Sequence, residues 1–107
     1  MAERWVRVLE ETELAEQARV EVDGEAYALF RIEDGIYALD DVCSHEYSRL
    51  SEGEVWDDEV YCPKHGSRFS IKNGEVRSFP AFKPVESYPV KVKEGGIYIN
   101  VEGAYEN

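Results

Sequence analysis

This 107-residue chain contains only two cysteines, and it has no long hydrophobic run. Its two cysteines are too few for the framework of a small secreted domain, and no stretch approaches the ~20 apolar residues of a membrane-spanning helix. The first residues, MAERWVRVLEE, lack the apolar segment of a secretory signal. Basic residues number 12 against 23 acidic ones, and the net charge of −11 disfavours nucleic acids and anionic membranes as partners. We therefore expect one cytoplasmic domain over residues 1–107 that binds neither.

Short strands joined by tight turns account for most of the chain. Asp23-Gly24 is a strong signal for a two-residue hairpin turn, and Asp34-Gly35 and Asn73-Gly74 predict further turns. Residues 10–17 predict a short helical turn, for which Thr12 is a candidate cap. Trp56 and Val60 mark a small hairpin. The predicted fold class is all-β with antiparallel sheets. Apolar alternation predicts its strands over residues 5–9, 18–22, 25–32, 36–39, 67–71, 75–77, 88–93 and 97–101.

All cysteines and histidines of the chain lie between residues 43 and 65. They form two mixed pairs, Cys43-x-His45 and Cys62-x-x-His65, with sixteen residues between them. Thiolates and imidazoles in such tight spacing are typical of metal ligands. Gly66 follows the second pair directly and permits a close backbone turn around a bound group. The pattern therefore predicts a metal site built from two loops.

Several interpretations of these four residues remain open on the residues alone. Zinc accepts two cysteines and two histidines, but its usual modules pair cysteine with cysteine and histidine with histidine. A cysteine nucleophile with a histidine base would explain only one of the pairs. Buried cysteines and hydrogen-bonded histidines, placed by chance, are a further possibility.

The mixed spacing resembles that of the Rieske family, in which Cys-x-His is followed after about fifteen to twenty residues by Cys-x-x-His-Gly. The chain reproduces this pattern as CSH at 43–45 and CPKHG at 62–66. The strands upstream and the segment SFPAFKPV downstream are also similar to those of small Rieske ferredoxins. The resemblance implies a Rieske iron-sulfur fold, sandwich-like, with a cluster-binding subdomain over approximately residues 41–84.

The resemblance also implies one Rieske-type 2Fe–2S cluster per chain. Cys43 and Cys62 would bind its inner iron, and His45 and His65 its outer iron. Because imidazoles donate less charge than thiolates, the iron bound by histidine is the more easily reduced one. The electron would therefore reside near the histidines, whose outer edges the family leaves at the surface.

Three further positions take their meaning from the same resemblance. Ser67 matches a hydroxyl that hydrogen-bonds to a cluster sulfur in respiratory Rieske proteins, whereas Phe69 replaces the tyrosine of a second such bond. Pro80 matches a proline-containing loop that covers the cluster from a third side. The ligand loops also lack the additional disulfide-forming cysteines of the respiratory proteins. These departures favour the ferredoxins of oxygenase systems over quinol-oxidising proteins.

The function that the resemblance implies is electron transfer, not catalysis. The carrier would take electrons from a flavin-containing ferredoxin reductase and pass them to a terminal Rieske oxygenase of the aromatic-ring dioxygenase type. We expect a monomer whose acidic surface is steered toward a basic docking surface. The alternatives are a cluster-bearing small subunit or accessory protein of another redox complex, such as a nitrite-reductase-like assembly or a cluster-assembly pathway, and a structural zinc protein.

Overall fold

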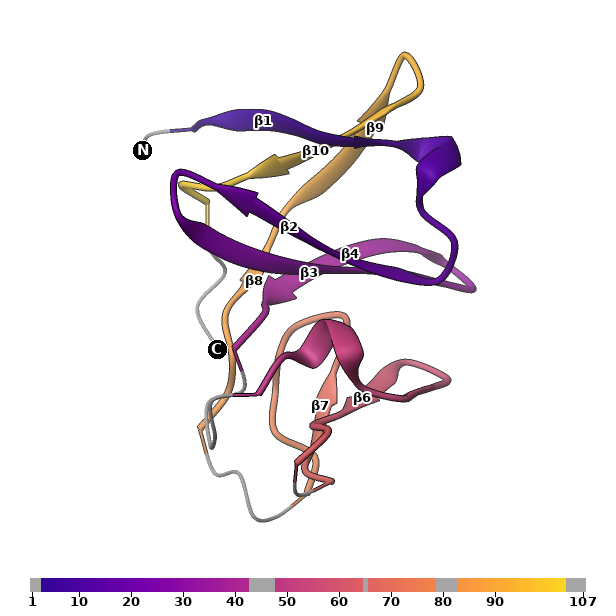
Figure 1. Cartoon of the computed structure of the whole chain (residues 1–107), viewed down its shortest axis with the longest axis vertical. Coiled ribbons are helices and arrows are strands. Elements are labelled where there is room, and N and C mark those ends of the chain that lie inside the picture. The colour runs from indigo at the N-terminus through magenta and orange to yellow at the C-terminus, as the bar shows by residue number, and fades with distance from the viewer. Residues whose placement is uncertain (1–2, 43–47, 65, 79–82, 104–107) are drawn as a thin grey trace.

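Three antiparallel sheets stacked in layers make up the protein (Figure 1). The structure is a computed structural model that describes residues 3–42, 48–64, 66–78 and 83–103. One outer sheet has the order β1-β10-β9, the middle sheet β2-β3-β4-β8, and the other outer sheet β5-β6-β7. Two 3₁₀ turns, η1 and η2, interrupt the strands. The elements are β1 (Trp5–Glu10), η1 (Glu11–Glu13), β2 (Gln17–Val22), β3 (Glu25–Ile32), β4 (Gly35–Asp40), η2 (Leu50–Glu52), β5 (Val55–Trp56), β6 (Glu59–Tyr61), β7 (Arg68–Ser70), β8 (Ser87–Tyr88), β9 (Val90–Lys93) and β10 (Gly96–Asn100).

The hairpins form where short turn signals reverse the chain. Asp23 and Gly24 between β2 and β3 have φ of 52° and 84°, and Glu94 and Gly95 between β9 and β10 have φ of 51° and 79°. Positive φ at both central residues is the conformation of the type I′ turn, whose twist matches that of paired strands. The predicted all-β class is therefore confirmed, and no described helix is long and apolar enough to cross a membrane.

The middle sheet is covered on both faces, so it divides the apolar interior into two clusters. Along β3, Ala28 and Phe30 face the β5-β6-β7 sheet, whereas Tyr27 and Leu29 face the β1-β10-β9 sheet. A strand that is buried on both sides has a nearly continuous apolar sequence, as in AYALF. The cluster on the first side contains Ala28, Phe30, Leu39, Leu50, Val60, Cys62, Phe69, Ile71 and Val85.

Three local predictions were wrong in detail. Thr12 does not cap the helical turn, because η1 begins after Glu10, whose amide donates to the carboxylate of Glu13 at 2.9 Å. The strand predicted over residues 88–93 is two strands in different sheets, separated by Pro89, which has no amide hydrogen for a ladder. The strand predicted over 75–77 is reduced to one isolated bridge between Val76 and Phe69.

Candidate metal centre

The second ligand loop closes a hairpin between β6 and β7. The amide of Cys62 donates to the carbonyl of Ser67 at 2.7 Å, and the amide of Gly66 donates back to the carbonyl of Cys62 at 2.9 Å. Gly66 has φ of 74°, a conformation that residues with a side chain rarely adopt. Cys62 is 1% exposed and belongs to the apolar cluster between the sheets. The hairpin thus fixes the Cys62 thiol at the edge of the core.

The first ligand loop is tied at its two ends. Val42, two residues after the end of β4, forms an isolated antiparallel bridge with Arg49, and the amide of Leu50 donates to the carbonyl of Asp41 at 2.7 Å. These bonds close a loop that contains the sequence positions of Cys43 and His45. The segment between these bonds therefore connects the middle sheet with η2.

A side-chain contact between described residues connects the segment after the first motif with the second ligand hairpin. The hydroxyl oxygen of Ser48 lies 3.0 Å from Sγ of Cys62, although the two residues are fourteen positions apart. Ser48 follows the sequence position of His45 by three residues. The contact therefore places the described end of the segment that follows the first motif against Cys62 of the second.

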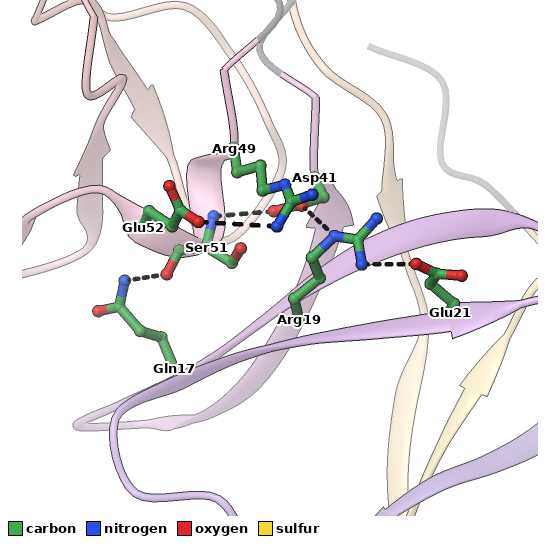
Figure 2. A network of polar contacts seen from close by, with 7 residues as sticks. All are labelled: Gln17, Arg19, Glu21, Asp41, Arg49, Ser51 and Glu52. Carbon is green, nitrogen blue, oxygen red and sulfur yellow. Dashed lines mark hydrogen bonds and ion pairs between the residues drawn. The ribbon is translucent and has the colours of Figure 1, made fainter.

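A buried carboxylate anchors the first loop to the middle sheet (Figure 2). Asp41 is 1% exposed, and its two oxygens accept hydrogen bonds from the amide of Ser51 at 2.9 Å and from Nε of Arg19 at 3.0 Å. Arg19 also pairs with the exposed Glu21 on the same strand. Gln17 donates its side-chain amide to the carbonyls of Ser51 and Gly53, which attaches η2 to β2. The network holds both ends of η2 on the first strand of the middle sheet.

The turn after η2 approaches the second ligand hairpin so closely that only glycine fits there. A Cβ atom on Gly53 would lie 2.0 Å from the carbonyl oxygen of Tyr61, the residue before Cys62. Backbone atoms cannot retreat as a flexible side chain can. The two ligand-bearing segments therefore pack backbone to backbone at this point.

Of the residues predicted for the site, Cys62 and Ser67 lie in the described part of the chain, and both are buried. Ser67 is fully buried and flanks the same hairpin loop as Cys62. Phe69 is also fully buried and packs in the same apolar cluster. The other predicted site residues, Cys43, His45, His65 and Pro80, lie outside the described residues.

Two contributors were missed from the sequence. Asp41 is the second of two aspartates after an apolar strand, a pattern that is typical of an exposed turn. Ser48 lies in a polar stretch with no periodicity, so no local signal distinguishes its hydroxyl. Only the pairing of Val42 with Arg49 brings that hydroxyl to Cys62.

The described side of the site fits an iron–sulfur cluster. Cys62 can provide a soft thiolate ligand; it is shielded from water and lies beside the hydroxyl of Ser48. The sequence adds a second cysteine and one histidine in each loop, the mixed donor set of a Rieske centre. A structural zinc module would instead place two like ligands in each pair.

Comparison with known proteins agrees with this donor set. The Rieske [2Fe-2S] domain model matches residues 4–89. The ferredoxin component of the naphthalene 1,2-dioxygenase/salicylate 5-hydroxylase systems of Ralstonia sp. is 31% identical over 104 residues, which cover 95% of this chain and 100% of the relative.

Two solved structures extend the comparison to the whole fold. A chain in the complex of reduced oxygenase and oxidized ferredoxin in carbazole 1,9a-dioxygenase superposes with a TM-score of 0.88 and 33% identity, covering 95% of this chain and 97% of that one. A putative nitrite reductase NADPH (small subunit) oxidoreductase protein superposes with a TM-score of 0.78 and 28% identity, covering 90% and 97%. The chain belongs to the Rieske [2Fe-2S] domain family, and its cofactor is a Rieske 2Fe–2S cluster.

Proposed function

We propose that this protein is the ferredoxin component of an oxygenase system, a one-electron carrier and not itself an enzyme. Relatives that match along nearly their whole length carry that description, and one matching structure is a complex of an oxygenase with a ferredoxin. The structural observation that supports the proposal is the contact of Ser48 with the buried Cys62, because it connects the segment after the first ligand pair with a cysteine of the second. A terminal oxygenase is the electron acceptor, and a flavin-containing ferredoxin reductase is the donor.

The ligands that we propose are Cys43 and Cys62 for the inner iron and His45 and His65 for the outer iron. When bound, the cluster supplies reversible one-electron chemistry. The protein contributes a hairpin that holds Cys62 out of water and the hydroxyl of Ser48, which lies 3.0 Å from Sγ of Cys62. Ser67 and Pro80 complete the surroundings in this proposal, Ser67 as a buried hydroxyl and Pro80 as part of a covering loop.

The charge of the chain is unevenly divided between the cluster-binding subdomain that we propose, residues 41–84, and the remainder. Those residues include eight acidic and six basic side chains, of 23 and 12 in the whole chain, which leaves 15 and 6 elsewhere. The net charge is therefore −2 in residues 41–84 and −9 in the remainder of the chain. A basic partner surface would attract the more acidic part of the carrier and so orient it during approach. Contact through residues 41–84, near the cluster, would involve fewer charges.

Transfer of electrons in a reconstituted chain tests the proposal. The purified protein is mixed with NADH, a flavin-containing ferredoxin reductase and an oxidised Rieske oxygenase, and reduction of the oxygenase is followed by stopped-flow absorbance. We expect reduction only when the carrier is present, and no reduction with Cys62→Ser in its place. An intact, reducible cluster that passes no electrons to any oxygenase tested would contradict the assignment.

A second function, the small subunit of a nitrite-reductase-like complex, is favoured by the fold that the chain shares with a protein of that description. The two functions differ in partner: the ferredoxin exchanges electrons with two proteins in turn, whereas the subunit stays bound to one. We propose a monomer with one cluster in the cytoplasm. Size-exclusion chromatography coupled to light scattering, in the presence of each candidate partner, distinguishes a transient carrier from a resident subunit.

A further inference from the structure

The hydroxyl of Ser48 is placed to act on the electronic state of the centre, and not only on the packing of its loops. Its oxygen lies 3.0 Å from Sγ of Cys62, which is 1% exposed. We propose that Ser48 is a positioning residue that donates a hydrogen bond to the ligating Cys62 thiolate and thereby raises the reduction potential of the cluster. The inference rests on the proposed ligation of iron by Cys62.

The direction of the hydrogen bond follows from the chemistry of the ligand. Either atom of a serine–cysteine pair can donate when the cysteine is a thiol. A cysteine bound to iron has lost its proton, so its sulfur can only accept. The hydroxyl of Ser48 is then the donor, and the bond is assisted by the negative charge of the thiolate.

The backbone around Ser48 supports a fixed donor. The next residue, Arg49, is bridged to Val42, and Leu50 donates its amide to the carbonyl of Asp41 at 2.7 Å. Nη1 of Arg49 also lies 3.8 Å from Oε2 of Glu52 in η2, an exposed ion pair (Figure 2). The serine therefore enters the site from a segment that is tied to the middle sheet, on the loop opposite the one that carries Cys62.

The effect on the potential follows from the charge of the two redox states. Reduction adds one negative charge, part of which resides on the sulfur ligands, so a donor to sulfur stabilises the reduced state more than the oxidised one. Burial of Cys62 strengthens the interaction, because little water is present to screen it. Ser48 thus acts in the same direction as the hydroxyl proposed at Ser67, but from the other loop.

Substitution of Ser48 in the cluster-containing protein tests the inference. Protein-film voltammetry should give a more negative midpoint potential for Ser48→Ala, with unchanged iron content. Resonance Raman spectra should show a higher Fe–Sγ stretching frequency, because a sulfur that loses a hydrogen bond binds its iron more strongly. Ser51→Ala is the matched control, since Ser51 lies in the same segment and contacts Asp41 and Gln17 through its backbone amide and carbonyl. Its potential should equal that of the wild-type protein.

The pair Ser48→Thr and Ser48→Val separates the hydroxyl from the volume of the side chain, and it remains informative if the alanine variant loses its cluster. Threonine retains the hydroxyl and valine has nearly the same shape without it. We expect the threonine variant to stay near the wild-type potential and the valine variant to be lower. Equal potentials for the two would overturn the inference, whereas a wild-type protein without a 2Fe–2S cluster would overturn the proposed function itself.

Discussion

Replacement of Asp41 by alanine should destabilise the protein more than replacement of any exposed carboxylate. The side chain is 1% exposed and accepts two hydrogen bonds, from Ser51 and from Arg19 (Figure 2). It precedes Cys43 by two positions, so its loss releases the segment that leads into the first ligand loop. Asp41→Ala therefore removes an anchor of the fold and of the site together.

The magnitude can be estimated from the two bonds. A hydrogen bond that involves a charged group contributes roughly 1.5–3 kcal/mol to stability. The side chain of Arg19 is 32% exposed, so water can replace the hydrogen bond that Arg19 loses in the variant, and this reduces the loss of stability. We expect a loss of about 2–3 kcal/mol in the free energy of unfolding. For a domain of this size each kcal/mol corresponds to about 4–8 °C in Tm, so the melting temperature should fall by at least 8 °C.

The control is Glu21→Ala, because Glu21 pairs with the same arginine but its side chain is 55% exposed. Exposed ion pairs contribute about 1 kcal/mol or less. Melting is followed by circular dichroism for the fold and by visible absorbance for the cluster. Asp41→Asn, which retains an acceptor oxygen, should lie between the two. If Asp41→Ala melted at the same temperature as Glu21→Ala, the buried carboxylate would not be the anchor described.

Loss of a ligand, screening of charge and acidification each give a distinct result. Cys62→Ser should be purified without visible absorbance or iron, and a normal spectrum would exclude Cys62 as a ligand. Electron transfer to the oxygenase should slow between 10 and 100 mM salt, where the Debye length falls from about 30 to about 10 Å, and equal rates would mean that the acidic excess serves solubility alone. Nζ of Lys72 lies 2.7 Å from Oδ2 of Asp34. This hydrogen bond is the main reason that the pKa of the Asp34 carboxyl lies below its usual 3.8, and a second hydrogen bond, from the Tyr37 hydroxyl, acts in the same direction. The ionised carboxyl therefore stabilises the fold above about pH 4 and loses this effect as the pH falls. The difference in stability between wild type and Lys72→Met should accordingly shrink in acid, and a difference independent of pH would contradict the pairing.

Local signals in the sequence were sufficient for most of the strands and for the turn of the first hairpin. Asp23-Gly24 is a strong signal for a two-residue turn, and the flanking residues alternate or are continuously apolar, so the hairpin of β2 and β3 is predicted without tertiary information. The mixed cysteine–histidine spacing likewise predicts a metal site from the residues themselves, and the resemblance to the Rieske family indicates which one. The hairpin lies within residues 17–32 and the ligand pattern within residues 43–65.

Features that depend on contacts between distant segments were not predictable in this way. Pro89 separates β8 from β9, and only the folded chain shows that β8 pairs with β4 whereas β9 pairs with β10. Asp41 looks like a turn residue until Arg19, 22 positions away, is brought beside it. Ser48 has no distinguishing pattern, and it gains its role only when the two ligand loops meet at Cys62.

The direct measurement is the metal and spin state of the purified protein. Analysis of iron and acid-labile sulfide should give about two of each per chain. After reduction with dithionite, electron paramagnetic resonance should show one signal with a lower average g value than that of plant-type ferredoxins. A colourless protein with one zinc ion per chain and no spin signal after reduction would contradict a Rieske centre at Cys43, His45, Cys62 and His65.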